Sequence, residues 1–415
     1  MATSPMAMQP LTGSSLKSQL RRAERMRKFK AFLLVAPLAL FLLIAFVFPI
    51  GSMLWRSVDN SELAQALPQT AQLLEEWDGQ SPPSEALYAS LAQELKNSLA
   101  SGAIGSVGRR LNYEDPSLRT LVTQTLRKLP DQPTTTWQET LGNINPRWAD
   151  LATWQTLKRV APQTTDRYLL AALDFERNNQ GEVTAIAAEK RVYVDVFLRT
   201  LWISGAVTLI CLLLGFPLAY LLATLPTSTS NLLMIFVLLP FWTSLLVRTA
   251  AWIVLLQSGG LVNNGLMSLG LISQPLELVF NRLGVLIAMV HILLPFMVLP
   301  LYSVMKGISP HYQRAAISLG AHPFKAFWEV YVPQTLAGVA AGTVLVFIMA
   351  LGYYITPALL GGPSDQMVSY YVAYYTNTTN NWGMAAALGA LLLIVTLVLY
   401  IVYQRLVNQQ QPSRR

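Results

Sequence analysis

Six apolar segments, each long enough to cross a lipid bilayer, constrain the fold of this chain more than any other feature. A membrane-spanning helix needs about 20 mostly apolar residues, and inside the bilayer its backbone must satisfy its own hydrogen bonds. The chain is 53% hydrophobic and only 13% charged, which is atypical of a soluble protein. The sequence therefore predicts an all-α integral membrane protein with six transmembrane helices. They cover residues 31–54, 198–225, 231–256, 284–305, 336–360 and 384–404.

A polar segment interrupts this pattern between the first and second predicted helices. Residues 56–195 hold 18 of the 22 acidic residues but only 14 of the 30 basic ones, so the segment is net acidic although the chain carries a charge of +8. Helical stretches such as SEALYASLAQELKNSLA are separated by breakers such as SPP and LPDQP. We expect a large, mainly helical inserted domain with its own core.

The distribution of Lys and Arg predicts which side of the membrane each loop occupies. Basic residues cluster before the first helix, after the last, and between the fourth and fifth, whereas the opposite short loops hold only Arg282. Both termini are therefore expected in the cytoplasm of a bacterium, with the insertion outside its inner membrane. The predicted organisation is a basic tail (1–30), a first helix (31–55), the insertion (56–195), a five-helix core (196–406) containing the cytoplasmic loop 306–335, and a tail (407–415).

The loop between the fourth and fifth helices contains the most informative motif, RAAISLGAHPFKAFWEVYVP. Ala315 and Ala316 are small residues within a helical pattern, so another surface could approach that helix closely. Gly320 can adopt the left-handed conformation that ends many helices. Pro323 suits the first turn of a second helix, and Pro333 marks the passage of that helix into the next span. The motif predicts a projecting helix–turn–helix.

This spacing resembles the EAA loop, E-A-A-x3-G-x9-I-x-L-P, of permease subunits in binding-protein-dependent ABC importers. The resemblance implies that Ala315, Ala316, Gly320 and Pro333 belong to a coupling helix that docks onto the ATPase subunit. Arg314 stands where the family has glutamate, so this chain departs from the family in the sign of the charge at that position. Segments such as LLPFWTSLLVRTAAWIVLLQ and YYITPALLGGP extend the resemblance, to spermidine/putrescine-type permeases, over residues 197–405 but not over the insertion.

The resemblance implies a permease subunit that pairs with a second permease and an ATPase dimer, and receives a small solute, most simply a polyamine, from a periplasmic binding protein. No Gly-Lys dipeptide occurs, so the chain has no Walker-type nucleotide loop. We therefore expect a non-enzymatic chain without a cofactor of its own, with ATP and Mg²⁺ bound by the partner ATPase. The alternatives are a stand-alone secondary transporter and an importer permease for a different small solute.

The predicted spans contain no Asp or Glu, so a cationic cargo would have to be screened by aromatic faces and carbonyl groups. The same rings also suit packing or interfacial belts. Arg248 is the one charge well inside a predicted span, and a structural role is favoured over contact with substrate. The candidate residues of the translocation path are Phe241, Trp242, Arg248, Tyr353 and Tyr354.

The histidines do not form a metal-binding or catalytic pattern. His291, His311 and His322 are scattered along the chain, and no zinc-ligand spacing is present. His291, inside an apolar segment, is interpreted as a helix-packing residue. We expect neither a metal site nor a catalytic site.

Overall fold

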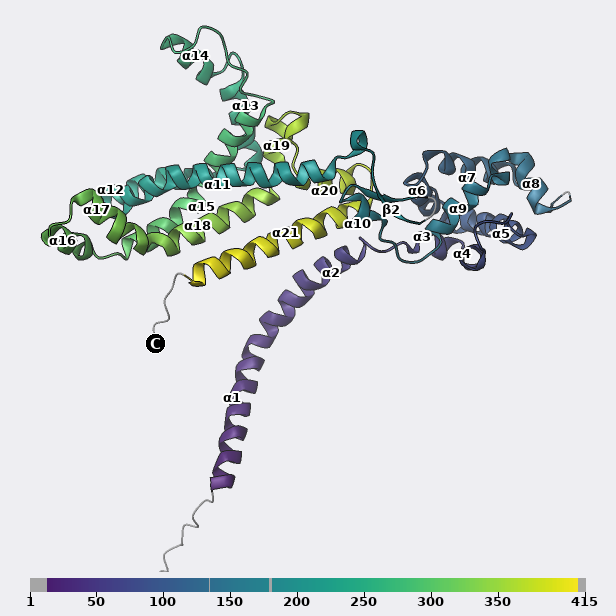
Figure 1. Cartoon of the computed structure of the whole chain (residues 1–415), viewed down its shortest axis with the longest axis horizontal. Helices are drawn as coiled ribbons and strands as arrows, with labels where there is room; N and C mark the ends of the chain where they lie inside the picture. The colour runs from purple at the N-terminus through teal and green to yellow at the C-terminus, as the bar shows by residue number, and fades with distance from the viewer. Residues whose placement is uncertain (1–12, 134, 179–180, 410–415) are drawn as a thin grey trace, which may run out of the picture. The chain divides into compact units, whose positions relative to one another are not determined.

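The computed structural model describes residues 13–133, 135–178 and 181–409. It divides into two compact units, Met1–Trp55 and Arg56–Arg415. Apart from one two-stranded hairpin, β1 (Phe175–Arg177) with β2 (Val183–Ala185), the regular structure of the described residues is helical (Figure 1). The predicted all-α membrane class is confirmed. Within these described ranges, six helical segments are long and apolar enough to span a membrane: Arg21–Trp55, Tyr193–Thr224, Leu245–Ser268, Arg282–Lys306, Pro323–Gly352 and Trp382–Arg405.

The first unit is one long helix with a local irregularity. α1 (Gly13–Leu42) passes through a π-helical turn (Leu43–Val47) into α2 (Phe48–Trp55). The π turn ends two residues before Pro49, whose missing N–H and bulky ring perturb the regular hydrogen-bond ladder of the preceding turn.

The insertion forms a helical domain around its own core. Tyr88, Trp148 and Trp154 are fully buried at its centre. The Tyr88 hydroxyl and the Trp154 indole N–H both donate to the carbonyl of Trp148, at 3.0 and 2.8 Å. Buried aromatic residues with satisfied polar atoms give such a core both apolar contact and a defined geometry. The helices are α3 (Ser61–Ala66), α4 (Pro68–Glu76), α5 (Glu85–Ser101), α6 (Ile104–Asn112), α7 (Pro116–Lys128), α8 (Trp137–Ile144), α9 (Leu151–Val160) and α10 (Arg167–Ala171).

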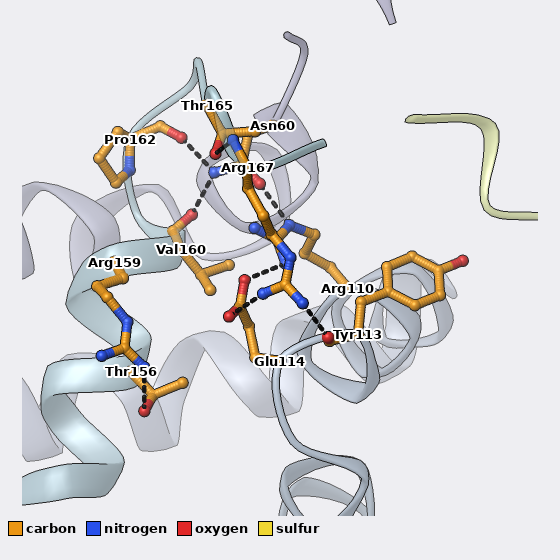
Figure 2. A network of polar contacts seen from close by, with 10 residues as sticks. All are labelled: Asn60, Arg110, Tyr113, Glu114, Thr156, Arg159, Val160, Pro162, Thr165 and Arg167. Carbon is orange, nitrogen blue, oxygen red and sulfur yellow. Dashed lines mark hydrogen bonds and ion pairs between the residues drawn. The ribbon is translucent and has the colours of Figure 1, made fainter. Parts of the chain in front are cut away.

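The two ends of this helical domain are held side by side. The Asn60 amide N–H donates to the carbonyl of Gln163 at 2.9 Å, and the Thr165 N–H donates to the carbonyl of Val58 at 2.8 Å. The Asn60 side chain also donates to the carbonyl of Val160 at 2.9 Å (Figure 2). The domain therefore begins and ends at one place in the fold.

An ionic network reinforces that junction (Figure 2). Arg110, which is fully buried, donates to Asn60 and pairs with Glu114 at 2.9 Å, and Arg167 pairs with the same carboxylate. Burial opposes ionisation of Glu114, but the two guanidinium groups hold the pKa of this carboxyl below its usual range. A buried guanidinium is tolerated here because its donors have partners.

Three long helices form the centre of the membrane core. α11 (Tyr193–Thr224), α15 (Arg282–Lys306) and α18 (Val332–Gly352) pack pairwise against one another (Figure 1). At Gly338 of α18, an added Cβ would lie 3.1 Å from the carbonyl oxygen of Pro300, so the absence of a side chain permits this close helix contact. The other helices are α12 (Thr227–Leu238), α13 (Leu245–Leu256), α14 (Leu261–Ser268), α16 (Pro310–Ser318), α17 (Pro323–Ala326), α19 (Ile355–Leu360), α20 (Val368–Asn377) and α21 (Trp382–Gln409).

The third predicted span, 231–256, is wrong as a single helix. After α12 the chain makes a 3₁₀ turn, Leu239–Trp242, and α13 starts only at Leu245. Pro240 lacks the N–H that a continuing helix needs. The Ser244 side chain accepts a hydrogen bond from the Val247 N–H at 3.2 Å, which caps a new helix. The segment long enough to span a membrane, Leu245–Ser268, combines α13 and α14.

The fifth predicted span, 336–360, is also displaced. Its helix starts earlier, at Pro323, and ends at Gly352, and the last part of the range forms the separate helix α19. Pro357 lies in the first turn of α19, where its missing N–H costs nothing, but it could not continue α18. Tyr353 and Tyr354 therefore occupy a break between helices.

The last helix of the insertion joins the membrane core. Tyr168 of α10 and Ala172, which directly follows that helix, share a buried cluster with Met384 and Leu388 of α21. Farther along, the buried Asp174 carboxylate accepts hydrogen bonds from the N–H groups at 192, 193 and 194, so it caps the start of α11. The insertion is thus attached to two helices of the core.

Candidate functional site

The loop 306–335 has the local geometry that its motif predicts. α16 ends with Gly320 in the left-handed conformation, at φ +93°. The Gly320 N–H donates to the carbonyl of Ile317 at 2.9 Å, and the Ala321 N–H donates to that of Ala316 at 3.1 Å. This pair of bonds is the Schellman arrangement. The left-handed conformation expected at Gly320 is confirmed.

The second helix of the loop leads without interruption into the membrane core. His322 caps α17 by accepting from the Phe324 N–H at 3.3 Å, and Pro323 occupies the first turn, as predicted. A π-helical turn, Phe327–Tyr331, connects α17 to α18, and Pro333 lies in the first turn of α18. Movement of the loop would therefore be transmitted directly to α18.

The outer surface of the loop is apolar and uncovered. Leu319, at the tip, is 89% exposed, and Tyr312 and Phe324 are also exposed. Arg314 and Ala315 are exposed, Ala316 is half-buried, and within the described residues no ion pair involves Arg314. The loop thus exposes several large apolar side chains together with a charged one.

The break between α12 and α13 brings together part of the predicted path. Arg248 folds back over the break: its guanidinium donates to the carbonyl of Thr243 at 2.9 Å and also to that of Pro240. The Pro240 carbonyl also accepts from the Thr243 N–H and hydroxyl, so Arg248 adds to the hydrogen bonds that hold the break in shape. This geometry agrees with the structural role favoured for Arg248.

The other predicted path residues separate into two groups. Phe241 packs on Phe296 of α15, with ring centroids 4.8 Å apart, whereas Trp242 is 74% exposed. Tyr353 is half-buried against the central core and lies within the electrostatic influence of Arg248; Tyr354 is exposed. The structure thus places Phe241, Arg248 and Tyr353 beside the central helices, whereas the rings of Trp242 and Tyr354 are exposed.

His291 contacts a neighbouring helix, as its interpretation as a helix-packing residue implies. Its side chain is exposed on α15, and its Nδ1 accepts a hydrogen bond from the Trp252 indole N–H at 3.2 Å. A histidine inside an apolar segment was the available signal, but only the α13–α15 packing reveals its partner.

Comparison with known proteins identifies the family. Residues 214–411 match the model of the family described as binding-protein-dependent transport system inner membrane component. The matched segment excludes the insertion.

Individual relatives agree with that match. The spermidine/putrescine transport system permease protein PotB of Haemophilus influenzae is 35% identical over 52% of this chain and 75% of its own length. PotB of Escherichia coli is 35% identical over 52% of this chain and 78% of its own length. A solved structure of a bacterial alginate ABC transporter, in complex with an alginate pentasaccharide-bound periplasmic protein, aligns with 51% of this chain and 76% of that chain, at 18% identity and a TM-score of 0.43. The family match and the two relatives show that this chain belongs to the inner-membrane components of binding-protein-dependent transport systems, the permeases of ABC importers.

Proposed function

We propose that this chain forms half of the translocation path of an ATP-driven importer for polyamines of the spermidine/putrescine class. The observation that carries the proposal is its 35% identity to two permeases named for these substrates, over 75% and 78% of their lengths. A second permease would complete the path, an ATPase dimer would bind ATP and Mg²⁺, and a periplasmic binding protein would deliver the cargo.

The loop 306–335 is the proposed contact with the ATPase. The exposed Leu319 and the small residues Ala315 and Ala316 support this role, because they offer an apolar surface that a partner can approach closely. Arg314 would meet an ATPase adapted to a cation at that position. In this proposal the loop and both chain termini lie in the cytoplasm, and the insertion lies on the other side of the inner membrane.

The proposed path contains aromatic rings rather than acidic groups. Each contact between an ammonium group and a ring contributes about 0.5–2 kcal/mol, which is weak enough for release. Phe241 and Tyr353 are the leading candidates, with Arg248 holding the helix break in shape. The lack of acidic residues in the predicted spans also favours the alternative, an importer permease for a different small solute.

Reconstitution tests the proposal directly. The complex of both permeases and the ATPase is purified in mild detergent, placed in liposomes, and supplied with the binding protein loaded with spermidine, with sulfate or with no solute. We expect spermidine-loaded receptor alone to stimulate ATP hydrolysis and uptake. Stimulation by another solute and not by spermidine would establish the alternative.

The insertion is proposed to contribute to docking of the binding protein, as opposed to being a passive cap. Because the Asn60 N–H and the Gln163 carbonyl are hydrogen-bonded at 2.9 Å, residues 61–162 can be replaced by a short linker without separating the ends. The shortened complex should still assemble with the ATPase. It should need a higher receptor concentration for half-maximal ATPase stimulation, and identical stimulation curves would leave the passive cap as the explanation.

A further inference from the structure

The first helix carries a dense basic segment that has no part in the transport function proposed above. Residues 21–30 hold six basic residues and a single acidic one, Glu24. They belong to α1, which continues as one helix to Leu42 (Figure 1). The segment will be called the basic collar, and its members are Arg21, Arg22, Arg25, Arg27, Lys28 and Lys30.

The charges of the basic collar are not compensated within the chain. All six basic side chains are exposed, and no ion pair among the described residues involves any of them. Like charges one helical turn apart, such as Arg21 and Arg25, destabilise a helix. Anions from outside the chain would therefore stabilise the collar.

The basic collar surrounds the helix instead of marking one face of it. Each residue of an α-helix is rotated by about 100° from the one before. Arg21 and Lys28 consequently lie on one side, Arg22 and Arg27 on the two flanks, and Lys30 on the opposite side. A protein partner contacts one face of a helix, whereas the headgroups of a lipid layer surround a helix that crosses it.

The spacing along the helix places half of the basic collar at headgroup level. The apolar residues 31–55 extend about 37 Å as a helix, more than the hydrocarbon core of about 30 Å, so their ends reach the headgroup layers. The inner half of the collar is Arg27, Lys28 and Lys30, which lie within about 6 Å of Ala31 along the axis. The outer half, Arg21, Arg22 and Arg25, lies about 9–15 Å away.

We propose that the basic collar binds the headgroups of acidic phospholipids. The guanidinium and ammonium groups of the inner half donate to phosphate oxygens, and their charge selects lipids that carry no compensating cation. Phe29 and Phe32, which are 60% and 66% exposed, contact the adjoining acyl chains. The inference goes beyond the proposed function and does not depend on which solute is imported.

The headgroup preference can be measured at one position of the helix. Leu34, 85% exposed and one turn beyond Lys30, is changed to cysteine in a Cys211→Ala background and labelled with a fluorophore. The full chain is placed in nanodiscs that contain brominated phosphatidylglycerol or brominated phosphatidylcholine as quencher. The matched control is Phe48→Cys, which is 70% exposed in the other half of the same helical unit. Phosphatidylglycerol should quench the label at 34 at an about fivefold lower mole fraction than phosphatidylcholine does. Both lipids should quench the label at 48 equally.

Two variants of equal charge separate headgroup contact from general attraction of anions. Replacing Arg27, Lys28 and Lys30 by glutamine should reduce the preference at 34 to below about twofold. Replacing Arg21, Arg22 and Arg25 by glutamine should leave it at about threefold or more, because exposed charges are screened beyond about 8–10 Å. Unchanged quenching at 48 shows that the helix still spans the bilayer in each variant.

Three results would overturn the inference. The first is equal quenching by the two lipids at 34 in the chain that keeps all six bases. The second is an equal loss of preference in the two glutamine variants, which would indicate a soluble acidic partner that reaches both halves of the collar. The third is displacement of phosphatidylglycerol by inorganic phosphate but not by chloride of equal ionic strength, which would indicate a site for free phosphate.

Discussion

The turn at Gly320 allows a quantitative test of the coupling loop. Its φ of +93° lies in the left-handed region, where a side chain costs roughly 1–2 kcal/mol per residue. A Cβ added at this position would meet no atom within 4 Å, so steric contact within the chain adds nothing to that cost. Gly320→Ala should therefore destabilise the turn by about 1–2 kcal/mol, through the backbone alone.

A series of substitutions separates the backbone from the side chain. Gly320→Asn should cost less than Gly320→Ala, because asparagine tolerates the left-handed conformation. Gly320→Leu should match alanine in turn stability, but it adds a side chain that projects toward whatever binds the loop. The leucine side chain would thus obstruct binding of a partner without a steric clash inside this chain.

Two measurements decide the matter. Hydrogen exchange at the residue 320 and Ala321 amides reports the turn, since these N–H groups close it; a loss of about 1.4 kcal/mol corresponds to roughly tenfold faster exchange. Receptor-stimulated ATP hydrolysis and uptake in liposomes report coupling. Asparagine should keep both activities, alanine should weaken coupling, and leucine should uncouple hydrolysis from uptake. Identical exchange in the alanine and asparagine variants would refute the backbone argument, and normal uptake with leucine would remove the loop from coupling.

Three further outcomes are expected. Gly338→Leu should lower the unfolding free energy by about 1–3 kcal/mol in a detergent titration, whereas Gly389→Leu, where an added Cβ meets nothing within 4 Å, should change it little. Glu114→Gln should lower the free energy of unfolding by about 1–3 kcal/mol. Because folding lowers the pKa of Glu114, its stabilising contribution is complete above the usual carboxyl pKa and is lost as the pH falls through the folded-state pKa. The stability of the variant should therefore decrease less steeply as the pH is lowered. Ser318→Cys, with Cys211 replaced, should resist an impermeant thiol reagent in intact cells, and labelling there would reverse the proposed topology.

Local chemistry explains which features were predictable from the sequence. Gly320 and Pro323 act through their own backbones, so the turn between α16 and α17 could be predicted without knowing its neighbours. The presence of six membrane-spanning segments depends only on the apolarity of each segment, so it was also predictable from the sequence. Pro240 was the available signal for the break after α12, but apolarity over the whole window outweighed it in the prediction.

The features that escaped prediction depend on contacts between distant segments. The exposure of His291 and its bond to Trp252 follow from how α13 meets α15. Periodicity and motif spacing carry no information about contacts between distant helices. The sequence therefore could not predict which of the candidate path residues lie close together.

The attachment of the insertion limits how it can move. Its ends are closed by the bond between Asn60 and Gln163, so the helical domain cannot extend like a tether. Tyr168 of α10 packs with Met384 of α21, and Asp174 caps the start of α11. A displacement of the insertion must break these buried contacts or carry α11 and α21 with it. Since the loop 306–335 leads directly into α18, which packs on α11, forces applied at the insertion and at the loop meet in the same helix pair.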